Sequence, residues 1–207
     1  MHVLIKDVIE FTSYAAGIYL LIFAVHFLFH TFPNWTSFRK ITEAFKGRLK
    51  ITPWGGARCE FQYKSTTVRL QVIPDWGKCH EPCIVVEMFK KASFDARIVR
   101  KGKWAAFDKW LWGPYSESIQ LGIPEFDKGF LIYTKDKVLA KNYLASNYVW
   151  QAIIRLFNQG WEDLYITPVR IEVQRHQSFA ELLSLNESGP KNGTVFLEEL
   201  SILAEHL

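Results

Sequence analysis

The sequence lacks the short motifs that mark common catalytic sites. There is no G-x-S-x-G nucleophile elbow, no H-E-x-x-H zinc motif, no G-x-G-x-x-G turn and no Walker phosphate loop. No motif pairs the acidic residues near expected strand ends, such as Glu117, Glu125 and Asp136, with a histidine or a nucleophile. We therefore expect no catalytic residues and a protein that is not an enzyme.

Cysteine is scarce and the excess of positive charge is small. Three cysteines, Cys59, Cys79 and Cys83, cannot all pair within one chain, which fits a reducing compartment better than a disulfide framework. The formal net charge is +4, from 25 basic and 21 acidic side chains. That excess is too small to indicate nucleic-acid binding, because such domains usually carry a basic stripe. No internal repeat or low-complexity tract is present.

Residues 1–32 contain the longest apolar stretch. Its central part, about residues 8–32, has one acidic side chain, Glu10, near its start. A helix of that length rises about 37 Å, enough to cross a hydrocarbon core of about 30 Å. No small-residue cleavage site follows, so we expect an uncleaved transmembrane anchor rather than a signal peptide.

The charges that flank this stretch predict its orientation. Five basic residues follow it between positions 39 and 50, whereas Lys6 alone precedes it. The positive-inside rule then places the N-terminus outside and the C-terminal domain in the cytoplasm, with the anchor in the inner (cytoplasmic) membrane. Membrane lipid and the integral subunits of a larger complex are the expected partners, and nucleic acid is not.

Residues 33–56 read as a basic amphipathic linker at the membrane interface. Phe38, Ile41, Phe45 and Leu49 recur at helical spacing with basic groups between them. This pattern predicts a short helix that lies either on the membrane surface or against the domain.

Residues 57–207 predict a cytoplasmic α+β domain. Six stretches with period-two or β-branched patterns predict a mainly antiparallel sheet, followed by a helical insertion over 136–160 with Gly160 as its C-cap. A hairpin with its corner at Thr167-Pro168 follows, and then short C-terminal helices, of which 194–207 is the last.

The text around residues 122–157 resembles bacterial, often membrane-anchored domains of unknown function. The matching positions are a Phe-Asp pair, a Phe-led strand, an acidic turn and a helix with Ala and Leu: Phe126, Asp127, Phe130, Asp136, Ala140 and Leu144. The resemblance implies a fold and supplies no catalytic residues. Physically, Phe126, Phe130 and Leu144 are the residues that a strand and a helix would bury together.

Three groups of residues are candidates for contact with partners or membrane. Small residues in the anchor let helix backbones approach closely, the interfacial segment offers an aromatic ring and basic groups, and a Trp-rich connection offers rings typical of interfaces. These residues are Ala15, Ala16 and Gly17, then Trp35, Arg39 and Lys40, then Trp104, Trp110 and Trp112. The alternative for the tryptophans is that they cap the domain's own core.

Two alternatives involve a cofactor. An imidazole in a membrane helix can ligate haem iron or chlorophyll magnesium, so His26 is the candidate tetrapyrrole ligand of a subunit in an electron-transfer or photosynthetic complex. The segment VHFLFHTFPNW resembles the end of light-harvesting β polypeptides, with His26 and Trp35 at the matching positions. Separately, the Cys79-His80-Glu81-Pro82-Cys83 run, joined by Cys59, offers thiolates and an imidazole to zinc in a regulatory domain or an enzyme. Its C-x₃-C spacing is poor for zinc, and a turn with packed cysteines is the simpler interpretation.

Overall fold

The structure is a computed structural model. It describes residues 12–14, 16–21, 38–39, 42–51, 57–73, 83–102, 117–176 and 195–207. The strands are β1 (Arg48–Ile51), β2 (Ala57–Tyr63), β3 (Thr66–Ile73), β4 (Cys83–Met88), β5 (Ala96–Arg100), β6 (Glu117–Ile119), β7 (Phe130–Thr134), β8 (Asp163–Ile166) and β9 (Ile171–His176). The labelled helices are α4 (Pro124–Gly129), α5 (Lys137–Leu144), α6 (Asn147–Asn158) and α8 (Val195–Glu205).

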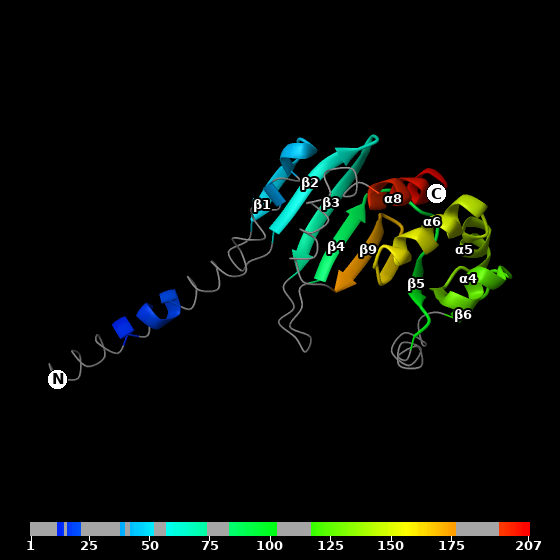
Figure 1. The fold of residues 1–207 in the computed structure, drawn as a ribbon, viewed down its shortest axis with the longest axis horizontal. Helices are drawn as coiled ribbons and strands as arrows, with labels where there is room; N and C mark the ends of the chain where they lie inside the picture. The colour runs from blue at the N-terminus through cyan, green and yellow to red at the C-terminus, as the bar shows by residue number, and fades with distance from the viewer. Residues whose placement is uncertain are drawn as a thin grey trace.

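One sheet of nine strands organises the domain (Figure 1). Its order is β1-β2-β3-β4-β9-β8-β5-β7-β6, and every neighbouring pair is antiparallel. Strands β1 to β4 form a meander, and the β8–β9 hairpin joins this meander to the second half of the sheet. The prediction of an α+β fold with a mainly antiparallel sheet is confirmed.

The two faces of the sheet differ because side chains alternate along each strand. In β3 the even positions Val68, Leu70 and Val72 are buried, whereas the residues between them are partly exposed. In β4, Ile84, Val86 and Met88 belong to the same hydrophobic core cluster. One face of the sheet is therefore apolar and the other carries mostly polar side chains.

The helices cover the apolar face. Val149, Ile153 and Leu156 of α6 are fully buried at helical spacing, and Leu197, Leu200 and Leu203 of α8 are too. These two helices pack against each other and join one core cluster with the sheet. Helix α6 ends as expected, because Gly160 has a φ of +93° just after its last turn.

The segment before β2 fits the expected short helix only in its first part. Residues 38–39 and 42–44 are helical, but Lys46 takes a φ of +50° and the chain then forms β1. A Cβ on Gly47 would lie 2.6 Å from the carbonyl oxygen of Glu60, so only glycine permits this close approach to β2. The apolar side chains nevertheless face the domain: Phe38 is fully buried and Phe45 stacks on Phe61 at 4.5 Å.

The N-terminal stretch is described over residues 12–14 and 16–21, which are helical. Tyr14, Ile18, Tyr19, Leu20 and Leu21 are 58–73% exposed. In Figure 1 these helical turns extend away from the β1 side of the domain. Within the described ranges, no helix combines the length and the apolar character needed to cross a membrane.

Candidate functional site

A row of polar side chains crosses the face of the sheet that the helices leave uncovered. The register places each member opposite the next one on the neighbouring strand. From β1 to β7 the row is Arg48, Glu60, Arg69, Glu87, Glu172, Tyr165, Arg97 and Tyr133. Directly opposed residues on one face interact, so the charges of this row are coupled from strand to strand.

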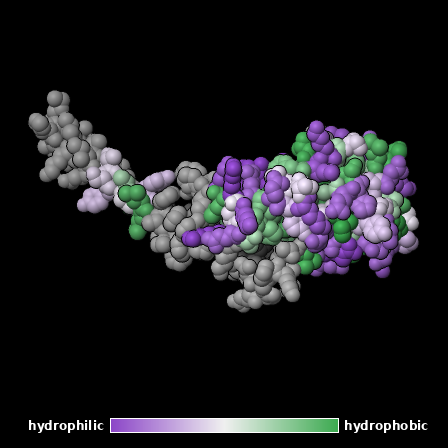
Figure 2. Space-filling view, turned by 90° about the horizontal axis from the view of Figure 1, so that it is seen from above, coloured by the Kyte–Doolittle hydropathy of each residue, from purple (hydrophilic) through white to green (hydrophobic). Residues whose placement is uncertain are grey.

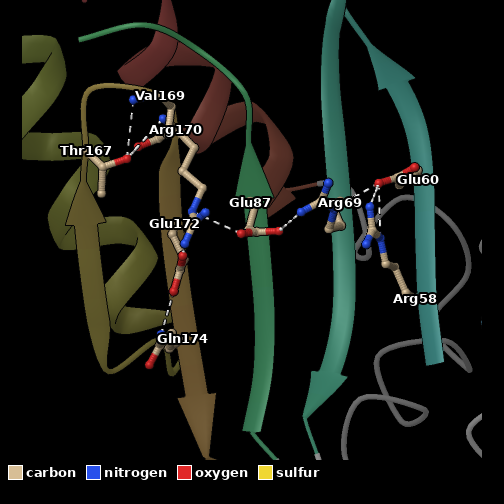
Figure 3. Close-up of polar contacts among 9 residues, drawn as sticks. All are labelled: Arg58, Glu60, Arg69, Glu87, Thr167, Val169, Arg170, Glu172 and Gln174. Carbon is tan, nitrogen blue, oxygen red and sulfur yellow. Dashed lines mark hydrogen bonds and ion pairs between the residues drawn. The ribbon is translucent and has the colours of Figure 1, made fainter. Parts of the chain in front are cut away.

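The central charges alternate in sign (Figure 3). Arg69 reaches Glu60 at 2.9 Å on one side and Glu87 at 3.0 Å on the other. Arg170 then joins Glu87 at 3.0 Å to Glu172 at 2.9 Å. Each oxygen of Glu87 lies next to a different guanidinium: Oε2 accepts a hydrogen bond from Arg69, and Oε1 forms an ion pair with Arg170. The two cations compensate a carboxylate whose side chain is only 3% exposed.

The arginines stabilise the two carboxylates that face each other across β4 and β9. Glu87 and Glu172 are directly opposed, an arrangement that is destabilising for like charges on a sheet. Arg170 binds both, and Gln174 donates to the second oxygen of Glu172 at 2.5 Å. At the outer end, hydrogen bonds from Arg58 and Arg69 hold the pKa of Glu60 below its usual value.

The row continues toward β5 through an aromatic residue. Arg97 donates to one oxygen of Asp163 at 3.0 and 2.7 Å, and its guanidinium lies 5.4 Å from the ring of Tyr165. Burial and the nearby charge of Asp163 raise the pKa of Tyr165 to about 12, so its hydroxyl stays protonated at neutral pH. Arg97, Asp163 and Tyr165 thus extend the charged network toward β5.

Basic side chains without acidic partners gather on and beside β1. Lys46, Arg48 and Lys50 are exposed, and none of them forms an ion pair with any residue that the structure describes. Glu60, which lies opposite Arg48, is already held by Arg58 and Arg69. The three cations are therefore free to act on something outside the described domain.

The predicted contact residues fall partly within the described ranges. Ala16 and Gly17 lie in the N-terminal helical turns and are exposed, with nothing within 4 Å of a Cβ built on Gly17. Arg39 is exposed and pairs with Glu43 at 2.8 Å. The other predicted contact and cofactor residues lie outside the described residues: Ala15, His26, Trp35, Lys40, Trp104, Trp110 and Trp112.

The structure separates two of the three cysteines proposed for zinc. Cys59 points into the hydrophobic core and accepts a hydrogen bond from Thr42 at 3.0 Å, whereas Cys83 lies on the polar face two strands away. A single zinc ion cannot reach both faces of the sheet, so Cys59 cannot join Cys83 in the alternative zinc site. Burial raises the pKa of both thiols, to about 11 for Cys83.

The remaining zinc candidates, Cys79 and His80, lie outside the described residues. Within the described part of the chain, no three His, Cys, Asp or Glu side chains are grouped to hold a metal ion.

The residues that carried the family resemblance have clear structural roles. Phe126, Phe130 and Leu144 belong to one core cluster, as expected, and Ala140 is fully buried in it. The carboxylate of Asp127 accepts from the backbone N–H groups of residues 121 and 122, at 2.9 and 2.8 Å. Asp136 is the N-cap of α5 and accepts from the N–H of Leu139.

The fold belongs to the α+β class, with one antiparallel sheet that has helices on one face. No known family model matches the sequence, and no curated protein does either. A match among solved structures is the crystal structure of the mycobacterial trehalose monomycolate transport factor A, TtfA. It has a TM-score of 0.47 and 8% sequence identity, over 80% of this chain and 93% of that one. A likeness at this level assigns no function.

Proposed function

We propose that this is a non-catalytic, single-pass membrane protein whose cytoplasmic domain scaffolds a larger membrane complex. The observation that carries the proposal is the set of large apolar side chains on the N-terminal helical turns. Five of them are 58–73% exposed, and exposed apolar surface of this kind marks a membrane or protein contact. The surrounding sequence, residues 8–32, has the length and composition of a membrane anchor.

The described part of the domain supports a binding role over a catalytic one. Two of its buried carboxylates, Glu87 and Glu172, are each paired with arginine side chains. The described helices α5, α6 and α8 pack on the apolar face of the sheet, and the polar face is cross-linked by charges. Its exposed cations on β1, Arg48 and Lys50, are the part of this face that we propose to contact a partner.

Purification of the tagged full chain in a gentle detergent tests the proposal. We expect stoichiometric integral membrane proteins to copurify, and the mass of the particle to exceed the 24.1 kDa of one chain by the mass of those partners. A matched control carries Leu20→Arg and Leu21→Arg in the exposed helical turns, and it should lose the partners while keeping the domain folded. A monodisperse monomer from the unmodified chain would contradict the proposal.

A further inference from the structure

The net charge of the chain is concentrated in one short segment. Residues 38–51 contain five basic side chains and one acidic side chain, and the remaining residues carry equal numbers of basic and acidic groups. The whole excess of +4 therefore resides beside and within β1, at the edge of the sheet. Figure 2 shows hydrophilic side chains on the end of the domain that lies toward the N-terminal helix.

Apolar side chains of residues 38–51 pack against the domain. Phe38 is fully buried, Phe45 stacks on Phe61, and Leu49 packs against the core. Phe38, Phe45 and Leu49 are thus unavailable to insert into lipid. Only its outer side, which carries Lys46, Arg48 and Lys50, faces away from the domain.

The burial of Phe38 also limits how far the domain can lie from a membrane. If the anchor ends near residue 32, about six residues connect it to Phe38, and they span at most about 22 Å when fully extended. The segment 38–51 is the first folded part of the domain after this short connection. Its cations are therefore brought close to the lipid headgroups, where surface charge acts within about 8 Å at physiological salt.

We infer that Lys46, Arg48 and Lys50 hold the domain against a bilayer surface that contains anionic phospholipid. The inference rests on the proposed anchoring, and it adds a defined surface and a defined partner to it. Charge complementarity selects this partner, because a cytoplasmic leaflet is negatively charged and these three cations have no acidic partner among the described residues. The docked domain presents β1 to the bilayer.

Single-molecule fluorescence energy transfer on the full chain in lipid nanodiscs tests the inference. A donor is placed on Ala44→Cys, an exposed position next to the basic group, with Cys79 and Cys83 replaced by serine; buried Cys59 remains. The acceptor is a headgroup-labelled lipid. High transfer reports a domain that lies on the bilayer, and low transfer reports a domain that lies away from it. Adding phosphatidylglycerol to phosphatidylcholine should raise the ratio of high-transfer to low-transfer molecules, and high salt should reverse the change.

Charge reversal gives the quantitative comparison. Each basic residue near an anionic surface changes the binding ratio about fivefold, so K46E, R48E and K50E together should lower it at least 100-fold, to about the neutral-lipid value. The matched control reverses Lys128, Lys135 and Lys141, which are exposed in the α4–α5 region at the other end of the sheet, and should leave the ratio within about twofold.

Two failures remain distinguishable. If alkaline carbonate strips the unmodified chain from membranes, the anchoring is wrong and the inference fails with it. If the chain stays in the membrane but the transfer ratio does not change when phosphatidylglycerol is added, the inference alone is wrong. Crosslinking of position 44 to a protein with no dependence on lipid charge would likewise overturn it.

Discussion

The alternating charges on the polar face predict that losing a cation costs more stability than losing a carboxylate. In Glu87→Gln, Arg69 keeps Glu60 at 2.9 Å and Arg170 keeps Glu172 at 2.9 Å, so neither guanidinium is left alone. The opposed pair of like charges also disappears. We expect a loss of about 1–2 kcal/mol in the free energy of unfolding, because a charge-assisted hydrogen bond is worth about 1.5–3 kcal/mol and the removed repulsion offsets part of that loss.

Arg170→Gln perturbs the same network in the opposite way. Glu87 and Glu172 then face each other with the bridging cation removed, although both side chains are at most 10% exposed. Breaking a buried pair by removing one partner typically costs about 3–5 kcal/mol. We expect about 3 kcal/mol, at the low end of that range, because Arg170 itself is 37% exposed and water screens part of the interaction.

Urea unfolding of a fragment that begins at residue 36 measures both variants, since it keeps Phe38 and the whole described domain. The double variant Glu87→Gln/Arg170→Gln should cost less than the sum of the two single variants by about 1 kcal/mol, because each removes a contact that the other shares. Equal costs for the two single variants, or strict additivity, would refute the view that Arg170 is the bridge between the two carboxylates.

Three further outcomes follow from individual side chains. Phe38→Ala should destabilise the same fragment by about 3–5 kcal/mol in urea unfolding, because the ring is fully buried; a loss below 1 kcal/mol would show that the ring does not belong to the core. Cys83, with a pKa raised to about 11, should react with iodoacetamide at pH 8 at least tenfold more slowly than a free thiol, as measured by mass spectrometry; a rate equal to that of glutathione would contradict the burial. The lowered pKa of Glu60 means that its contribution is complete above about pH 4.5 and is lost as pH falls through the folded value, so Glu60→Gln should be less stable than the parent at pH 7 and the difference should shrink below pH 4. If the stability difference between the parent and Glu60→Gln grew as the pH fell, the lowered pKa of Glu60 would be contradicted.

The sheet could be predicted because its strands carry period-two patterns that burial enforces. The stretch around Thr66–Ile73 alternates cleanly, and α5 and α6 show helical spacing, a side-chain cap at Asp136 and a glycine at the end of α6. Strand β1 could not be predicted in the same way. Phe38, Phe45 and Leu49 fit helical spacing, yet the left-handed Lys46 and the contact of Gly47 with β2 turn the chain into a strand.

The polar row was missed because its members lie far apart in the sequence. Glu87 meets Arg69 and Arg170 only after the register of β3, β4 and β9 is known. A weak signal was present: basic and acidic residues occur at alternate positions in Arg58–Glu60 and in Arg170–Glu172, at spacings that place both on one face of a strand. Such pairs indicate a charged face, but they do not identify which strands meet.

Membrane anchoring by the N-terminal segment is the central claim, and alkaline carbonate extraction of cell membranes tests it most directly. The unmodified full chain should remain in the membrane pellet, and the variant with Leu20→Arg and Leu21→Arg should move to the supernatant, because a charged side chain costs about 2.5–3.5 kcal/mol at the centre of a spanning helix. Release of the unmodified chain by carbonate, with the domain still folded, would contradict the account.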